Sequence, residues 1–129
     1  MIVVPPSGVA TRMSSDVLAV DDPAVARALV FIRDHLAEPI GIVDVVGASG
    51  VSRSNLEHRF RDRLRRTINK EIRRRRLKRA ETLLLDTTMT LQEIATAAGF
   101  GRATYFNNVF TDHHGMAPGV WRRRHRKNP

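Results

Sequence analysis

The sequence predicts an all-α protein of about seven helices, arranged as two helix-turn-helix subdomains joined by a central connector helix. Two similar segments, 48–60 and 97–110, each combine the end of a short helix, a glycine, an apolar residue and a second helix ending in Phe. Between them, residues 67–85 place apolar side chains at near-helical spacing under a dense cationic face. We therefore expect a first unit at 22–66, the connector at 67–86 and a second unit at 87–127.

The front of the chain differs from the rest. Residues 1–20 carry Pro5-Pro6 and Ser7-Gly8 and show no helical period, so we expect a linker over 1–21. Asp22 and Pro23 then predict the N-cap and the first residue of a helix that ends before Pro39.

The first turn is predicted between helices at 42–49 and 53–64. Gly47 weakens the earlier helix by roughly 1 kcal/mol relative to Ala, so tertiary packing has to hold it. Gly50 suits a left-handed turn, Val51 is expected to point into the core, and the Ser52 hydroxyl predicts the N-cap of the helix that continues to about Leu64.

The second unit has a matching set of signals. Thr90 and Glu93 predict a capping box for a helix at 91–98, and Gly99-Phe100 predicts the turn. An outer helix is expected from 102 to about 113, and Gly115 is expected to prevent it from continuing. A short last helix begins at Pro118 and carries Trp121, which is expected to close the second core.

Charge is concentrated in one part of the chain. The net charge is +9, and residues 53–79 hold 13 Lys and Arg against three acids, a net charge of +10 for that segment. A cationic stripe favours a polyanionic partner because each neutralised phosphate releases counterions. A solvated basic face is the alternative. With no Cys and no apolar run longer than 28–32, disulfides, thiolate metal sites and membrane spans are not expected. We expect a cytoplasmic protein.

The outer helices are expected to read DNA with the faces opposite their buried residues. Leu56 and Phe60 mark the buried face of the first, and Phe106, Val109 and Phe110 that of the second. The candidates for base reading are Arg53, Ser54, Glu57, His58, Arg102, Thr104, Asn107 and Asn108, because these side-chain types can pair with base edges. The candidates for phosphate contact are Arg59, Arg61, Arg73, Arg74, Arg76, Thr111 and Arg122. The alternative is that they are ordinary surface residues.

Several motifs connect the chain to a known family. The second unit contains Glu93-Ile94-Ala95, Gly99-Phe100, Tyr105-Phe106, Val109-Phe110, Gly115 and Pro118 with Trp121-Arg122, and the connector contains Arg76-Leu77, Ala80 and Leu83-Leu84. With these residues the chain from Asp22 onward resembles the tandem helix-turn-helix domain of AraC/XylS-type transcription regulators. Ser52 to Glu57, Arg59-Phe60, Thr67-Ile68 and the front piece around Val4-Pro5-Pro6 resemble, more narrowly, the xylose operon regulators.

The resemblance implies a sequence-specific DNA-binding domain of a transcription regulator, an activator of xylose or related sugar catabolism genes. Its partners would be double-stranded operator DNA and RNA polymerase. Residues 1–21 would be a linker and the tail of a missing sugar-binding domain, through which alone D-xylose would act. No cofactor and no membrane contact are expected, and the isolated chain is expected to be a monomer. The two outer helices would enter successive major grooves roughly 34 Å apart.

Three residues depart from the family pattern. Gly101 stands where the second outer helix usually has a Ser or Asp N-cap, His114 where an aromatic residue commonly packs, and Arg65 where Gly is frequent after the first unit. We expect an unchanged fold of modest stability.

Other classes of protein fit less well. The five histidines have neither metal-ligand spacing nor an evident carboxylate partner, and His113 and His114 are expected to point to different sides of a helix, so we expect no catalytic and no metal site. A generic basic nucleic-acid-binding or membrane-surface helical protein remains the alternative, because the connector alone would suit either.

Overall fold

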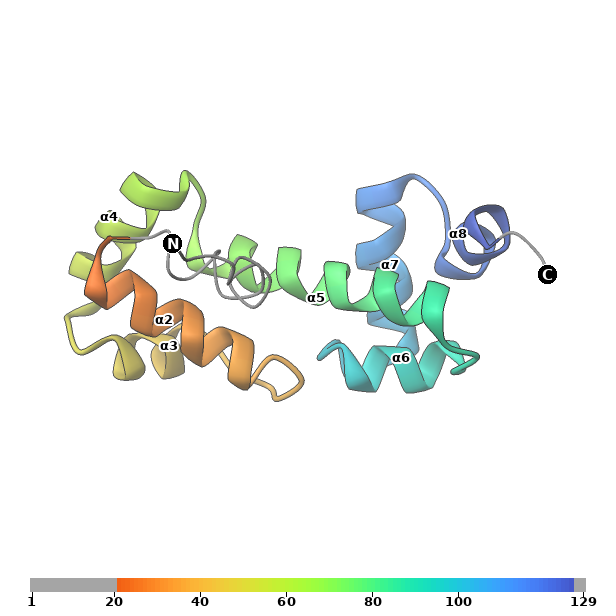
Figure 1. The fold of residues 1–129 in the computed structure, drawn as a ribbon, viewed down its shortest axis with the longest axis horizontal. Coiled ribbons are helices and arrows are strands. Elements are labelled where there is room, and N and C mark those ends of the chain that lie inside the picture. Colours follow the sequence, from red (N-terminus) through yellow and green to blue (C-terminus); the bar gives the residue numbers. More distant parts are fainter. Residues whose placement is uncertain (1–20, 127–129) are drawn as a thin grey trace, which may run out of the picture. The chain divides into compact units, whose positions relative to one another are not determined.

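The computed structural model describes residues 21–126, so residues 1–20 of the linker expected at 1–21 lie outside the described part. This part holds seven helices and no strand, which confirms the predicted all-α class. They are α2 (Pro23–Asp34), α3 (Ile42–Ser49), α4 (Arg53–Leu64), α5 (Ile68–Asp86), α6 (Leu91–Ala97), α7 (Ala103–His114) and α8 (Pro118–His125) (Figure 1). Contacts divide the described residues into two compact units, 21–34 with 41–68 and 35–40 with 69–126.

In the first unit α2 packs against both α3 and α4. The buried apolar residues are Ala24, Val25, Ala28, Leu29, Ile32, Val45, Leu56, Phe60 and Ile68. The Asp22 carboxylate accepts from the backbone N–H of Ala24 at 3.0 Å, which confirms the predicted N-cap. Despite Gly47, α3 forms as expected; Val45 anchors it, and the Arg27 guanidinium donates to the Ser49 carbonyl at its end (2.9 Å).

The first turn follows the sequence prediction with one difference. Gly50 is left-handed, with φ +82°, and the Ser52 hydroxyl accepts from Asn55 N–H at 3.3 Å. Val51, expected in the core, is only half-buried. The buried residue at this turn is Ser49, whose hydroxyl donates to the Val46 carbonyl and accepts from Val51 N–H.

In the second unit one aromatic cluster organises the core. The buried residues of this cluster are Leu77, Ala80, Leu84, Ile94, Ala95, Ala98, Phe100, Phe106, Phe110 and Trp121. The Phe110 ring lies 5.6 Å from Phe106 and 5.5 Å from Trp121 in edge-to-face geometry, so Trp121 closes this core as predicted. Val109, expected to be buried, is only partly so. The capping box is also confirmed, since Thr90 and Glu93 exchange both hydrogen bonds.

Gly99 has no room for a side chain. Its φ is +95°, and a Cβ at this position would lie 2.2 Å from the Leu36 carbonyl oxygen. The Arg76 guanidinium holds that stretch of backbone by donating to the carbonyls of Leu36 (3.2 Å) and Glu38 (2.8 Å). These bonds explain why residues 35–40 group with the second unit, although the sequence placed them with the first.

The start of α7 differs from the sequence prediction. Gly101 is not the N-cap: it has φ +86° and lies one residue earlier, while Arg102 occupies the N-cap position without a side-chain cap bond. Gln92 of α6 takes over the capping, accepting from Ala103 N–H (3.0 Å) and donating to the Gly101 carbonyl (3.1 Å). Glycine is therefore favoured here by its backbone conformation.

Among the described residues, no helix is long and apolar enough to span a membrane.

Arg65 and Gly115 occupy the same left-handed position at the ends of α4 and α7, with φ +61° and +77°. Because a non-glycine residue is strained there, we predict that Arg65→Gly raises the free energy of unfolding by about 0.5–1 kcal/mol and that Gly115→Ala lowers it by about 1 kcal/mol. Urea denaturation measures both. Arg65→Gln removes the same charge but keeps a side chain, so it should raise the free energy of unfolding much less than Arg65→Gly. An equal increase would mean that the substitution relieves charge repulsion and not backbone strain.

Candidate nucleic-acid interface

The outward face of α4 carries the first group of candidates. Leu56 and Phe60 are fully buried, while Ser54, His58 and Arg61 are exposed and Glu57 is half-buried, as the spacing predicted. Arg53, in the first turn, donates to the Glu57 carboxylate one turn on, at 3.1 Å. The side chains of Arg53 and Glu57 are 60% and 42% exposed, so water screens this pair, which contributes little stability and can open to meet another partner.

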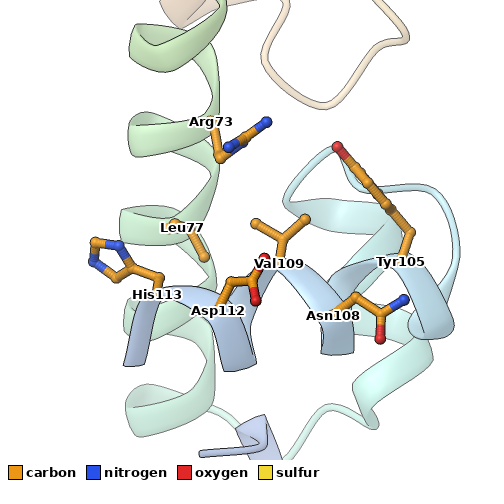
Figure 2. Close-up of a pocket in the computed structure, with 7 residues that line it drawn as sticks. All are labelled: Arg73, Leu77, Tyr105, Asn108, Val109, Asp112 and His113. Carbon is orange, nitrogen blue, oxygen red and sulfur yellow. The ribbon is translucent and has the colours of Figure 1, made fainter. Parts of the chain in front are cut away.

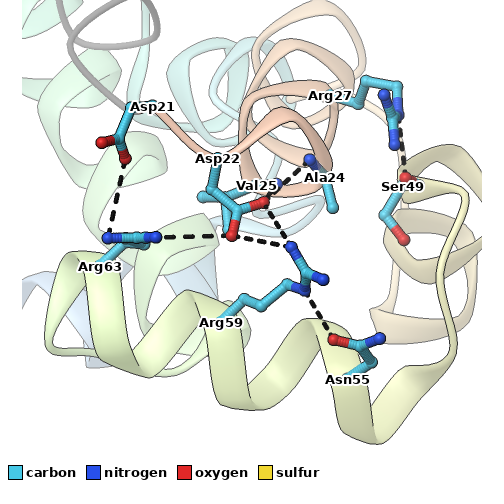
Figure 3. Close-up of polar contacts among 9 residues, drawn as sticks. All are labelled: Asp21, Asp22, Ala24, Val25, Arg27, Ser49, Asn55, Arg59 and Arg63. Carbon is cyan, nitrogen blue, oxygen red and sulfur yellow. Dashed lines mark hydrogen bonds and ion pairs between the residues drawn. The ribbon is translucent and has the colours of Figure 1, made fainter.

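An ionic cluster fixes α4 to the start of α2 (Figure 3). The Arg59 guanidinium donates to both Asp22 carboxylate oxygens, at 3.0 and 3.2 Å, and to the Asn55 side-chain oxygen at 2.6 Å. Arg63 lies 3.9 Å from Asp22 and 3.7 Å from Asp21. The side chain of Asp22 is only 4% exposed, so this carboxylate joins the N-cap of α2 to the helix that carries the candidate reading face.

Burial of Asp22 raises the pKa of its carboxyl group, but the backbone hydrogen bond from Val25 and the Arg59 guanidinium outweigh burial and lower the pKa below 3.8. A carboxyl group whose pKa is lower in the folded state stabilises the fold above its unfolded pKa. That stabilisation is lost as pH falls through the lower pKa that the Asp22 carboxyl group has in the folded state.

The outward face of α7 carries the second group. Phe106 and Phe110 are fully buried, and Thr104, Asn107, Asn108 and Thr111 are exposed, as predicted. Arg102 is exposed at the N-cap position just before the helix. Gln92, which caps this helix, was missed by sequence reasoning because its partners lie nine and eleven residues away.

Beside this face, an open groove of about 470 Å³ runs between α5 and α7 within the second unit. Its lining residues are Arg73, Leu77, Tyr105, Asn108, Val109, Asp112 and His113 (Figure 2). Tyr105 is 49% exposed, and its ring lies 5.9 Å from Phe100 in edge-to-face geometry. Sequence reasoning did not select Tyr105 as a site residue, although it shares a face with Asn108 and Asp112 at positions i+3 and i+7.

Three half-buried phosphate candidates donate to groups of the protein itself. Arg59 binds Asp22, and Arg76 binds the carbonyls of Leu36 and Glu38. Arg122 donates to three carbonyls, those of Leu84 (2.9 Å), Thr87 (2.8 Å) and Met89 (2.8 Å). Desolvation lowers the pKa of Arg76 and of Arg122. These hydrogen bonds give the three arginines a structural role in the fold.

The remaining phosphate candidates lie at the surface. Arg61, Arg73 and Thr111 are exposed, and Arg74 is an exposed neighbour of Glu71 (3.5 Å). Glu71 is a buried carboxylate that also pairs with Arg75, so part of the positive charge of α5 neutralises an acid of the same helix.

The histidines at the end of α7 differ from the sequence prediction. His114 shares a hydrogen bond of 2.8 Å with the Glu81 carboxylate, and the ring of His113 lies 4.7 Å from that of His114. The expectation of no evident carboxylate partner is therefore wrong, and so is the expectation that the two rings point to different sides of the helix, because both converge on Glu81. Glu81 lies on α5, 33 residues earlier, so sequence spacing does not indicate the pair. His114 also packs 4.2 Å from Phe110, in the aromatic role expected at its position.

Two compact units, each with a short helix, a left-handed glycine turn and an outer helix with a polar exposed face, define a helix-turn-helix protein of the DNA-binding class. Residues 45–124 match the helix-turn-helix domain family, and the chain belongs to the AraC-type branch of these transcription regulators.

Relatives support this assignment. The xylose operon regulatory protein of Escherichia coli (strain K12) is 38% identical over 121 residues, which cover 94% of this chain and 31% of that protein. A solved structure of the xylose-binding transcription activator xylR is 35% identical with a TM-score of 0.74, covering 84% of this chain and 29% of that one. The solved structure of an AraC-type regulator from Chromobacterium violaceum is 29% identical with a TM-score of 0.73, and the match covers 83% of this chain and 95% of that one. The chain thus spans less than a third of the xylose operon regulatory protein.

The Asp22 cluster generates a prediction about pH. Asp22→Asn keeps an oxygen that can cap α2 but removes the charge facing Arg59, so we expect it to lower the free energy of unfolding by about 1–3 kcal/mol at pH 7. The difference from the natural protein should shrink as pH falls below 3.8, because protonation then removes the charge of Asp22 from the natural protein, and the variant lacks that charge at every pH. Denaturation curves between pH 3 and 7 measure it. Asp21→Asn, at the exposed neighbour, is the control; an effect as large as that of Asp22→Asn would contradict the assignment.

The Arg122 clamp generates a second prediction. Arg122→Ala leaves three carbonyls without their charged donor, so we expect the free energy of unfolding to fall by about 2–4 kcal/mol in the absence of DNA. Arg123→Ala removes an exposed arginine of the same helix and should change the free energy of unfolding by no more than about 0.5 kcal/mol. Thermal unfolding compares the two variants. Equal stability would show that Arg122 does not hold the end of α5.

Proposed function

We propose that this chain binds double-stranded operator DNA in a sequence-specific manner, with α4 and α7 each reading base edges in a major groove. One observation carries the proposal: both helices bury large apolar residues on one side, Leu56 and Phe60 in α4 and Phe106 and Phe110 in α7, and expose polar side chains on the other. The exposed groups suit base edges, since Asn pairs with adenine, Arg with guanine, and Glu accepts from cytosine N4.

The two reading faces differ in composition, so we propose a non-palindromic site. The α4 face offers Arg53, Ser54, Glu57 and His58, and the α7 side offers Arg102, Thr104, Asn107 and Asn108. Successive major grooves on one DNA face lie about 34 Å apart, and the proposal requires the two helices to enter consecutive grooves.

We propose that phosphate contacts come from Arg61, Arg73, Arg74 and Thr111. Arg73 is exposed beside the α7 face, in the groove that also holds Tyr105 and Asn108 (Figure 2). A cation at this place would fix the position of α7 on the duplex without reading sequence.

For the whole regulator we propose activation of genes for xylose or related sugar catabolism, through contact with RNA polymerase in the cytoplasm. Support comes from the relatives, which include a xylose operon regulatory protein and a xylose-binding transcription activator. D-Xylose would act through a sugar-binding domain outside this chain, and the isolated 129-residue chain would be a monomer.

The test of sequence-specific binding separates reading from positioning. We expect Asn107→Ala and Glu57→Ala each to relax base preference at one position of the site, by about 1–3 kcal/mol, because each removes a base-edge partner. Arg73→Ala should weaken binding to specific and scrambled duplexes alike. Fluorescence anisotropy with single-base variants of a footprinted operator measures both effects.

Asn69→Ala is the matched control, because Asn69 is an exposed asparagine on α5 outside the two faces. It should leave base preference unchanged. If every variant lost equal affinity for specific and scrambled duplexes, the chain would be a generic basic nucleic-acid binder and the face assignment would fail.

The proposed route of the sugar generates a separate prediction. If D-xylose acts only through a domain outside these 129 residues, it makes no different contacts with two states of this chain, and operator affinity stays constant. The measurement is a titration of labelled operator with and without millimolar D-xylose, with L-arabinose as the control. A xylose-specific tenfold change, about 1.4 kcal/mol of coupling, would instead require a ligand site inside the helical units.

A further inference from the structure

Three side chains of the second unit that the proposed DNA-binding function does not use form a cluster of metal-ligand type. They are Glu81 on α5 and His113 and His114 at the end of α7. One ligand atom from each lies within 4.8 Å of the other two. Carboxylate oxygen and imidazole nitrogen are both ligands that Zn²⁺ takes in proteins. We propose that these three side chains bind a divalent transition-metal ion, with Zn²⁺ as the cation.

The distances are close to what such a site needs. Zn²⁺ binds nitrogen and oxygen ligands at about 2.0–2.2 Å, so neighbouring ligand atoms of a tetrahedral site lie roughly 3.3–3.5 Å apart. The oxygen of Glu81 and the Nε2 atom of His114 are 2.8 Å apart, joined by a proton that the cation would replace. His113 is exposed, and a rotation of its ring would bring the third ligand into range. Water would take the fourth position.

The fold holds two of the ligands in place without the metal. The ring of His114 packs between Phe110 at 4.2 Å and Trp121 at 5.3 Å, so the aromatic core fixes its orientation. Glu81 is half-buried on the neighbouring helix. Because these two ligands already face each other, binding has to order only His113, which lowers its entropic cost.

The ligand chemistry sets the selectivity. Two imidazoles and one carboxylate favour borderline cations, so Cu²⁺ and Ni²⁺ should also bind, whereas Mg²⁺ and Ca²⁺ prefer sites made wholly of oxygen ligands. The cation would bridge α5 and α7 and stabilise the second unit, because it binds the folded site and not the separated ligands.

The experiment is a calorimetric titration of the tag-free chain with ZnCl₂, together with thermal unfolding. We expect one Zn²⁺ per chain, with a dissociation constant on the order of 10 µM, and a rise in Tm of several degrees at saturating Zn²⁺. Millimolar Mg²⁺ should leave Tm unchanged. Co²⁺ gives a second readout, because tetrahedral coordination produces visible absorption that does not depend on stability.

Variants locate the site. His113→Ala should weaken Zn²⁺ binding at least tenfold and abolish the Co²⁺ absorption while keeping the helical circular dichroism, because His113 is exposed and outside the core. Glu81→Gln should act in the same direction. His58→Ala removes an exposed histidine of the first unit and should bind Zn²⁺ as tightly as the natural chain. No heat or Tm change up to 1 mM Zn²⁺, or undiminished binding by His113→Ala, would overturn the proposal.

Discussion

The structure depends on arginine side chains that donate to backbone carbonyls near the ends of short helices. The last carbonyls of a helix have no partner within it, and a small helical domain has many such ends. Arg122 satisfies three carbonyls around the end of α5, Arg76 binds two in the segment after α2, and Arg27 binds the last carbonyl of α3. Among the described side chains that are not exposed, no buried nitrogen or oxygen atom lacks a hydrogen-bond partner. The planar guanidinium suits this task because its donors point in several fixed directions.

This use of arginine changes how the positive charge is interpreted. Residues 53–79 carry a net charge of +10, yet Arg59 pairs with Asp22, Arg75 with the buried Glu71, and Arg76 with carbonyls of the same unit. A smaller set of cations, including Arg61 and Arg73, is exposed to solvent. Net charge therefore measures the attraction of the domain for a polyanion, while contacts within the fold decide which guanidinium groups could touch one.

The two helix-turn-helix units reach similar geometry by different means. In the first, Ser52 caps its own helix and Gly50 makes the left-handed turn. In the second, Gly99 and Gly101 are both left-handed, and Gln92 of the preceding helix caps α7 in place of a local Ser or Asp. Gly101 is therefore a turn residue and not a poor N-cap. The capping hydrogen bond of α7, for which the sequence shows no local Ser or Asp, comes from Gln92 of α6.

The sequence by itself determined the helices and their faces. The Ser52 cap, the Thr90–Glu93 box, the turn at Gly50 and the buried pairs Leu56–Phe60 and Phe106–Phe110 all involve residues within four positions of one another, where spacing along the chain corresponds to distance in space. The tertiary structure alone decided that Arg59, Arg76 and Arg122 bind the protein, that residues 35–40 group with the second unit, and that Glu81 meets His114. These partners lie 33 to 40 residues apart, and only the packing of helices brings them together.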